Sequence, residues 1–318
     1  MHTLLLAAGL LGAWLLLKAA SPLSAHPTRG VRMASSFMLL SLLPASALTL
    51  AIATFFMVDQ ECFAHSAPWD QAASLVASTG VIAYFAASVA RVVERRWRLA
   101  RLIQTLPISR DPAVLTVIKG LGGEIGVKVL PLDRPAAFVL GWRRPEVVLS
   151  DWMLGNLDFA ELEAVVAHEL AHVGRKDVVL AALGALWARF VPLAALRQIQ
   201  ATLVADIENA ADALAVGRTG RPLALASALA KFWKFGSTPD LALSGVPQFT
   251  GAETIERRIG RLMGLTESGD AIDGRRDLGR SLIAIALAWG FVILTLGIAP
   301  SMAMAQDHQL LCKVELPS

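Results

Sequence analysis

Four long apolar segments constrain the fold of this 318-residue chain more than any other feature. Only the first contains a charged side chain, Lys18, and the segments cover residues 3–20, 37–58, 72–90 and 281–299. A helix rises about 1.5 Å per residue, so each segment is long enough, or nearly so, to cross a hydrocarbon core of about 30 Å. We therefore predict a mainly α membrane protein with four transmembrane helices, three before and one after a more polar block.

The composition agrees with a membrane protein. Apolar residues make up 55% of the chain and charged residues 17%, whereas about a quarter of the residues of a soluble domain are charged. The net charge of +3 is small for this length, so it gives no indication of direct nucleic-acid binding. The two cysteines, Cys62 and Cys312, are too few for a disulfide scaffold and lack metal-ligand spacing.

The first apolar segment has two interpretations, a cleaved signal peptide or a retained span. No Lys or Arg precedes its apolar run, and Lys18, Arg29 and Arg32 follow it. A signal peptide has the opposite order, with its basic residues first. We therefore expect a retained transmembrane helix.

The basic residues that flank the spans predict the orientation. Arginines are concentrated at 29–32, 91–101 and 275–280, while the loop 59–71 has no Lys or Arg. With four spans, all of these basic segments fall on one side, which the positive-inside rule places in the cytoplasm. Both termini then lie outside. The expected organisation is three transmembrane helices in 1–94, a cytoplasmic domain in 95–275, a fourth transmembrane helix in 276–303 and a short extracytoplasmic tail in 304–318.

A fifth apolar run covers residues 178–196. Arg189 lies within it and Pro192 interrupts it. We expect a buried or membrane-grazing helix here rather than a span, because a crossing would put the downstream residues on the wrong side of the membrane.

The polar block has the pattern of an α+β domain. Asp111 and Pro112 mark the cap and the first position of a helix. Asp158, followed by Glu161, resembles a capping box at the start of another helix, and Gly174 is its natural end. Short β-like runs lie between these two helices at 127–132, 136–141 and 146–150. Further helices are predicted at 177–190, 193–216, 222–234 and 252–263.

The helix that begins after Asp158 carries the sequence HELAH at residues 168–172. His168 and His172 are one turn apart on one face, so both imidazoles can bind the same metal ion. A catalytic zinc has three protein ligands and an open position for water. Glu169 is then placed to act as the general base on that water. The alternative is an ordinary solvated helix with two histidines.

The third zinc ligand is expected to be a carboxylate, because the next histidine, His308, is placed across the membrane. Glu208 and Asp212 lie four residues apart on one helical face, so Glu208 could ligate while Asp212 accepts the free N–H of a ligand histidine. Asp206 is expected to face solvent. Asp177 either braces the site or caps the next helix.

The run 136–141 could form an edge strand beside the site. A peptide substrate could then bind along Ala137, Phe138 and Val139 by adding a strand to the sheet. The alternative is a purely structural hairpin.

HELAHVGRKD at 168–177, followed by ENAAD at 208–212, resembles the gluzincin metallopeptidases. Three spans, a cytoplasmic zinc domain, the Arg-rich run 253–264 and a fourth span are similar to the BlaR/MecR antirepressor family of bacterial membrane metallopeptidases, family 56. The resemblance implies one zinc ion per chain at His168, His172 and Glu208, with Glu169 catalytic. It also implies regulatory proteolysis of a protein substrate, a cytoplasmic transcriptional repressor or the chain itself, at the bacterial cytoplasmic membrane.

The chain departs from that family after the fourth span, where a short tail replaces the sensor domain. A second interpretation is a membrane quality-control protease of the HtpX or CAAX type. A third is a non-catalytic transducer that binds a partner, although the intact HELAH and Glu208 argue against it. Cys62 and Cys312 both fall in outer segments, where disulfides persist, and are the candidates for a disulfide bond.

Overall fold

The computed structural model describes residues 33, 35–36, 39–41, 44–48, 51–52, 68–122, 125–141, 144–175, 177–190, 194–235 and 252–264. The predicted first and fourth spans, most of the second span, the tail and both cysteines lie outside these residues. Two compact units are present: residues 1–90, 186–200 and 279–318 form one, and residues 91–185 and 201–278 form the other.

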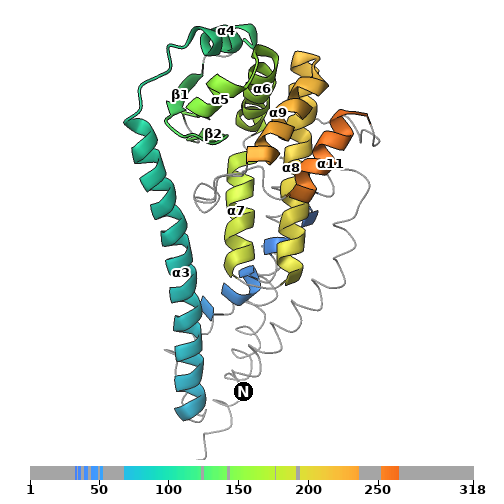
Figure 1. Ribbon diagram of the computed structural model, residues 1–318. Helices are drawn as coiled ribbons and strands as arrows, with labels where there is room; N and C mark the ends of the chain where they lie inside the picture. The colour runs from blue at the N-terminus through green and yellow to red at the C-terminus, as the bar shows by residue number, and fades with distance from the viewer. Residues whose placement is uncertain are drawn as a thin grey trace, which may run out of the picture. The chain divides into compact units, whose positions relative to one another are not determined.

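The longest described helix is α3, Pro68–Gln104 (Figure 1). It contains the predicted span 72–90 and continues without a break through the arginine-rich segment 91–101. Within the part of the chain that the structure describes, the segment Ala72–Gln104 is the only helix long and apolar enough to cross a membrane. Its 33 residues extend over about 50 Å, more than a hydrocarbon core needs.

The apolar run 178–196 is divided between two helices, α7, Asp177–Phe190, and α8, Ala194–Thr219. Helix α7 has 14 residues and a length of about 21 Å, which is shorter than a hydrocarbon core.

Aromatic side chains join the end of α7 to α3 inside the first unit. Phe85 stacks on Trp187 with ring centroids 5.8 Å apart, and it meets Phe190 edge to face at 5.1 Å. Tyr84 stacks on Phe190 at 5.6 Å. The hydroxyl of Tyr84 also donates to the carbonyl of Arg189 over 3.3 Å.

The second unit contains a three-stranded sheet of β1, Gly126–Leu130, β2, Ala137–Leu140, and β3, Glu146–Ser150. The strand order is β1-β3-β2, with β3 parallel to β1 and antiparallel to β2. All three strands fall where the alternation of apolar and turn residues predicts them. Within the described sheet β2 is an edge strand.

The connection from β2 to β3 depends on Gly141. Its φ of 89° is in the left-handed region, which L side chains rarely adopt. A Cβ atom at this position would lie 2.5 Å from the carbonyl oxygen of Arg144. The turn therefore requires glycine for both its backbone conformation and its space.

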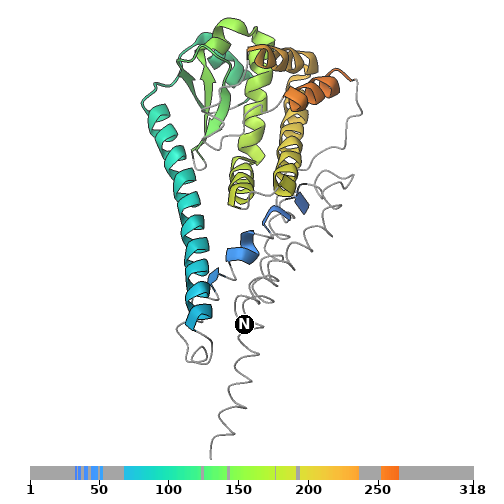
Figure 2. The same cartoon turned by 60° about the horizontal axis from the view of Figure 1, so that its bottom comes forward.

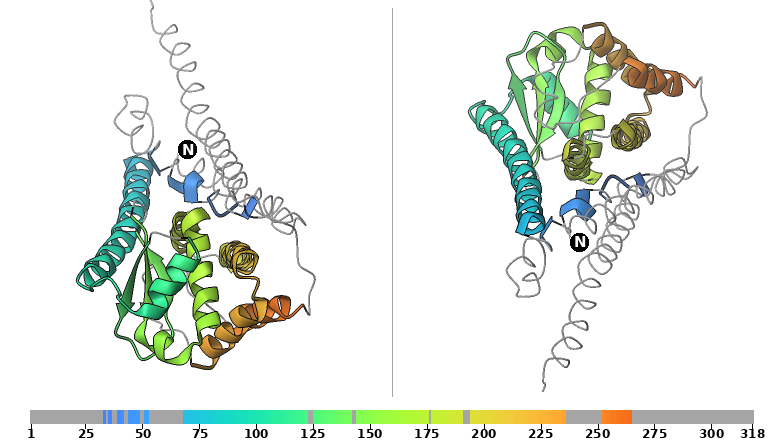
Figure 3. Two further views of the ribbon diagram at one scale, coloured as in Figure 1. Left: turned by 90° about the horizontal axis from the view of Figure 1, so that it is seen from above. Right: turned by 90° about the horizontal axis from the view of Figure 1, so that it is seen from below.

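Helix α6, Phe159–Arg175, packs between the sheet and further helices. One core joins α6 to the sheet, to α4, Pro112–Gly120, and to α9, Pro222–Phe235. In Figures 2 and 3 the sheet lies on one side of α6, and α11, Ala252–Leu262, lies on the other side. The short helix α5, Asp151–Asn156, follows β3 directly.

Both predicted helix starts are confirmed. Asp111 accepts hydrogen bonds from the first-turn backbone of α4, at 2.8 and 3.3 Å. Asp158 and Glu161 exchange reciprocal side-chain-to-backbone bonds of 2.8 Å at the start of α6, which is a capping box. The helix ends at Arg175, one residue beyond the predicted stop.

The Glu161 carboxylate also fixes α6 against α9. It accepts 2.6 Å bonds from Ser227 and from Lys231 of that helix. Because Glu161 is buried, these charge-assisted bonds are stronger than surface pairs. The helix that carries HELAH is therefore held at its first turn.

Candidate metal centre

The two histidines of HELAH lie one turn apart on α6 and are both buried. Their rings meet edge to face, with centroids 4.7 Å apart. The Nε2 atoms of His168 and His172 are 3.1 Å apart, so the two lone-pair nitrogens converge on one point rather than diverging into solvent.

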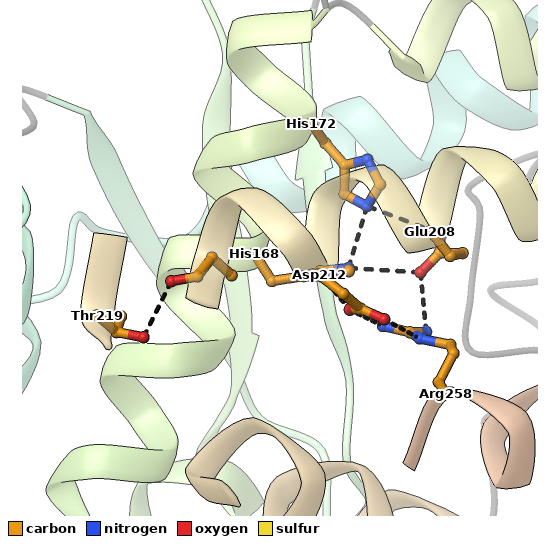
Figure 4. Close-up of polar contacts among 7 residues, drawn as sticks. His168, His172, Glu208, Asp212, Thr219 and Arg258 are labelled. Atoms are coloured by element: carbon orange, nitrogen blue, oxygen red, sulfur yellow. Dashed lines mark hydrogen bonds and ion pairs between the residues drawn. The ribbon is translucent and has the colours of Figure 1, made fainter. Parts of the chain in front are cut away.

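Helix α8 brings a carboxylate to the same point. Glu208 Oε2 lies 3.4 Å from His168 Nε2, and Glu208 Oε1 lies 3.7 Å from His172 Nε2. Figure 4 shows the two imidazoles and this carboxylate facing one another across the gap between α6 and α8. The three residues that the sequence suggested as ligands are brought together here.

The spacing of these atoms fits a tetrahedral zinc ion. Zinc binds imidazole nitrogen and carboxylate oxygen at about 2.0–2.2 Å, so two tetrahedral ligand atoms are separated by roughly 3.3–3.5 Å. The distances of 3.1, 3.4 and 3.7 Å bracket that separation. Two nitrogens and one oxygen are also the donor set of a catalytic zinc site, which keeps its fourth position for water.

Asp212 determines which nitrogen of His168 faces the ligands. Its Oδ1 lies 3.0 Å from His168 Nδ1, where a carboxylate requires an N–H. A neutral His168 then keeps its lone pair on Nε2, the nitrogen that points at His172 and Glu208. This is the role that the sequence suggested for Asp212.

A fifth member of the cluster, Arg258 of α11, was not suggested by the sequence analysis. Its Nε and Nη2 donate to the two carboxylate oxygens of Asp212 at 2.8 and 2.6 Å. Its Nη1 lies 2.9 Å from Glu208 Oε2. The guanidinium thus bridges both carboxylates from the side opposite the histidines (Figure 4).

A pattern in α11 could have revealed this arginine. Ile255, Ile259 and Leu262 follow helical spacing and pack against the core of the second unit. Arg258, three residues after Ile255, lies on that same apolar stripe and is 1% exposed. A charged side chain on an apolar stripe indicates a buried partner of opposite charge.

The charges in the cluster shift its pKa values strongly. Burial opposes protonation of His168, but the carboxylates of Asp212 and Glu208 outweigh it and raise the pKa of His168 to about 9 in the metal-free protein. Burial likewise opposes ionisation of Glu208, but Arg258 and the histidines lower its pKa to about 2. The pKa of Asp212 is lowered against burial by the same guanidinium and by His168.

Glu169, the expected general base, is buried beside the two histidines. Burial is the largest influence and raises the pKa of its carboxyl group, although the neighbouring histidines oppose the shift. A carboxylate with a raised pKa is a better proton acceptor near neutral pH.

The sequence also suggested positions for Asp206 and Asp177. Asp206 was expected to face solvent, and this was wrong, because it is 2% exposed; α8 is enclosed by its neighbours on more than the ligand face. Asp177 is the first residue of α7, and its side chain lies outside the described set.

The proposed substrate strand, Ala137, Phe138 and Val139, has all three side chains buried. Phe138 packs with Leu99 and Val148 in a small core on one face of the sheet. Only the backbone edge of β2 is therefore left to pair with a peptide.

Comparison with known proteins gives one family. Residues 126–269, just under half of the chain, match Peptidase family M48. This range contains the sheet, HELAH, Glu208, Asp212 and Arg258. The match supports an M48-type zinc metallopeptidase domain, whereas the expected resemblance to the BlaR/MecR family is not supported.

Similar curated proteins include several HtpX proteases. A "Protease HtpX homolog" from Acidiphilium cryptum is 32% identical over 158 residues, which cover 37% of this chain and 55% of that protein. One from Thermococcus sibiricus is 31% identical over 107 residues, covering 31% and 35%. "Protease HtpX" from Pseudomonas fluorescens is 29% identical over 112 residues, covering 31% and 38%. The chain therefore spans between about a third and just over half of the length of these relatives.

Proposed function

We propose that this chain is a membrane-associated zinc metalloendopeptidase of the HtpX type, which cleaves membrane proteins or proteins at the membrane surface as part of quality control. The observation that carries the proposal is the convergence of His168 Nε2, His172 Nε2 and the Glu208 carboxylate within 3.1–3.7 Å. The relatives, all named HtpX proteases, favour this function over cleavage of a transcriptional repressor.

The chemistry follows from the positions of the side chains. Zinc, when bound by the two imidazoles and the carboxylate, supplies a Lewis acid that acidifies water and polarises a scissile carbonyl. Glu169 accepts the proton of the attacking water and delivers it to the leaving amine. Asp212 keeps the Nδ1 proton on His168, so that Nε2 stays available as a ligand. The edge of β2 can hold an extended peptide by backbone hydrogen bonds.

The membrane association rests on α3 and on the apolar segments around it. We propose that α3 crosses the bacterial cytoplasmic membrane through residues 72–90 and that its arginines at 91–101 stay in the cytoplasm. The metal centre, which belongs to the unit that begins at Arg91, then faces the cytoplasm. Four spans in total remain the proposal from the sequence.

The function can be tested with full-length protein in nanodiscs, loaded with zinc and given an unfolded reporter such as casein. We expect Glu169→Gln to retain zinc and to lose cleavage by at least about 10²–10⁴-fold, the usual contribution of a general base. Glu163→Gln is the control, because Glu163 lies on the same helix but pairs with Arg221 away from the cluster. Undiminished cleavage by zinc-loaded Glu169→Gln would exclude this mechanism.

A further inference from the structure

Arg258 is an unusual residue to find in the core of the second unit. It is among the largest side chains that are fully buried in the described residues. A buried guanidinium loses its hydration, so it persists only where carboxylates replace the water. Asp212 and Glu208 replace it here, and both raise the pKa of Arg258 against the effect of burial.

Docking of α11 does not by itself require this arginine. Ile255, Ile259 and Leu262 already pack α11 against α6 and α9 with an apolar surface. A buried ion pair stabilises a fold no better than apolar side chains of similar volume, and often less well. A methionine at this position would pack equally well only if Asp212 and Glu208 were apolar too, so the charge of Arg258 acts through these two carboxylates.

The contacts of the guanidinium show how Arg258 holds the two carboxylates. Arg258 uses three nitrogens: Nη1 holds Glu208 Oε2, while Nε and Nη2 hold the two oxygens of Asp212. The Asp212 oxygen bound by Nη2 is the same Oδ1 that faces His168 Nδ1. One planar cation therefore fixes a ligand carboxylate directly and a ligand imidazole through Asp212.

We propose that Arg258 is a positioning residue of the metal centre, through which zinc affinity depends on the docking of α11. Without it, both carboxylates would lose the cation that holds them in place, so Glu208 would turn away from the histidines or Asp212 would turn away from His168. Either change weakens the ligand set. This inference rests on the proposed function, since it presumes that the site binds zinc.

A Coulombic effect of Arg258 on zinc affinity acts in the opposite direction, so a measurement can separate the two effects. Removal of a positive charge near a divalent cation strengthens the Coulombic attraction of the site for zinc. If that effect were dominant, loss of Arg258 would leave zinc binding equal or tighter. Our proposal requires that preorganisation of Glu208 and Asp212 outweighs it.

The experiment compares Arg258→Met with Arg257→Met, an exposed neighbour on the same helix, in full-length protein in nanodiscs. Zinc affinity is measured by competition with a chelator. Loss of a group that orients metal ligands typically weakens binding by about 10- to 100-fold, and we expect that range for Arg258→Met and less than about twofold for Arg257→Met. Equal or tighter binding by Arg258→Met would overturn the proposal.

A second readout separates positioning from mere stabilisation of the fold. Coupling is reciprocal, so zinc should slow amide hydrogen exchange in α11 of the wild-type protein and should have no such effect in Arg258→Met. If Arg258→Met lowers the melting temperature of the metal-free protein but leaves zinc affinity unchanged, the role is structural and the proposal is wrong.

Arg258→Lys keeps the test decisive if Arg258→Met does not fold. Lysine retains the charge but cannot bridge two carboxylates with a planar fork, so zinc affinity should fall between the wild-type and the Arg258→Met range. Wild-type affinity in this variant would overturn the proposal. If wild-type protein itself binds no zinc, the proposed function fails instead, which keeps the two failures distinguishable.

Discussion

Asp212→Asn is a nearly isosteric change that tests how the site controls its histidine. Asp212 accepts hydrogen bonds from two nitrogens of Arg258 at 2.8 and 2.6 Å, and its Oδ1 lies 3.0 Å from His168 Nδ1. Asparagine replaces one of the accepting oxygens with an NH₂ group. In the Oδ2 position that group would face only Nε of Arg258, where two donors repel; in the Oδ1 position it would face His168 Nδ1 as well as Nη2 of Arg258.

In the second arrangement the amide donates to His168 Nδ1 and moves the ring proton to Nε2. Nε2 is the atom that faces His172 and Glu208, so zinc must then displace a proton from its own ligand. We expect zinc affinity to fall by about 10- to 100-fold, the range for residues that orient metal ligands, which corresponds to about 1.4–2.8 kcal/mol.

The assay for Asp212→Asn is chelator competition followed by zinc analysis of the full-length protein. Glu163→Gln serves as the control, because it also converts a carboxylate to an amide but at a residue that pairs with Arg221. Equal zinc affinity in the two variants, at chelator concentrations that remove zinc from His168→Ala, would refute the reasoning about the tautomer.

Three further outcomes are expected. In the chelated protein, the pKa of His168, raised from 6.5 to about 9, gives stability below about pH 6.5 that is lost as pH rises through 9. The pKa of Glu208, lowered from 4.5 to about 2, gives stability above about pH 4.5 that is lost in acid. Thermal melting should therefore be highest between these limits, and a steady rise toward pH 9 would contradict the assignment. Gly141→Ala should destabilise the fold by about 1–3 kcal/mol through strain in its turn, measured by denaturant unfolding; an unchanged midpoint would count against it. Cys62 and Cys312 should form a disulfide, detectable by non-reducing mass spectrometry after thiols are blocked at lysis, whereas full alkylation of both would exclude it.

Local patterns in the sequence were sufficient to predict the helices and strands around the site. The capping residues Asp111 and Asp158 fix helix starts through short-range hydrogen bonds, which depend on a few neighbouring residues. The three strands are bounded by turn residues, and each falls within a residue or two of its prediction. HELAH needs only helical spacing to place two imidazoles on one face.

Tertiary contacts could not be predicted from such local patterns. The strand order β1-β3-β2 depends on how the sheet packs on α6, which no local pattern encodes. Asp206 was expected in solvent because a lone aspartate usually is, but the neighbours of α8 enclose it. Arg258 joins Glu208 across 50 residues of sequence, and its position on the apolar stripe of α11 was the one available sign.

The pattern of apolar segments also did not predict the family. The order of apolar segments suggested the BlaR/MecR family, whereas the match of residues 126–269 is to Peptidase family M48. Number and order of spans are shared by unrelated membrane proteins, so they carry little information about ancestry. The residues of the metal centre restrict the chemistry much more tightly.

The central claim is that HELAH and Glu208 form one catalytic zinc site. Its most direct test is metal analysis combined with zinc X-ray absorption of the purified full-length protein. We predict one zinc per chain, bound by two imidazole nitrogens and one carboxylate oxygen in addition to water, with zinc retained in Glu169→Gln and lost in Glu208→Ala. Stoichiometric zinc in Glu208→Ala with an unchanged absorption spectrum would contradict the account.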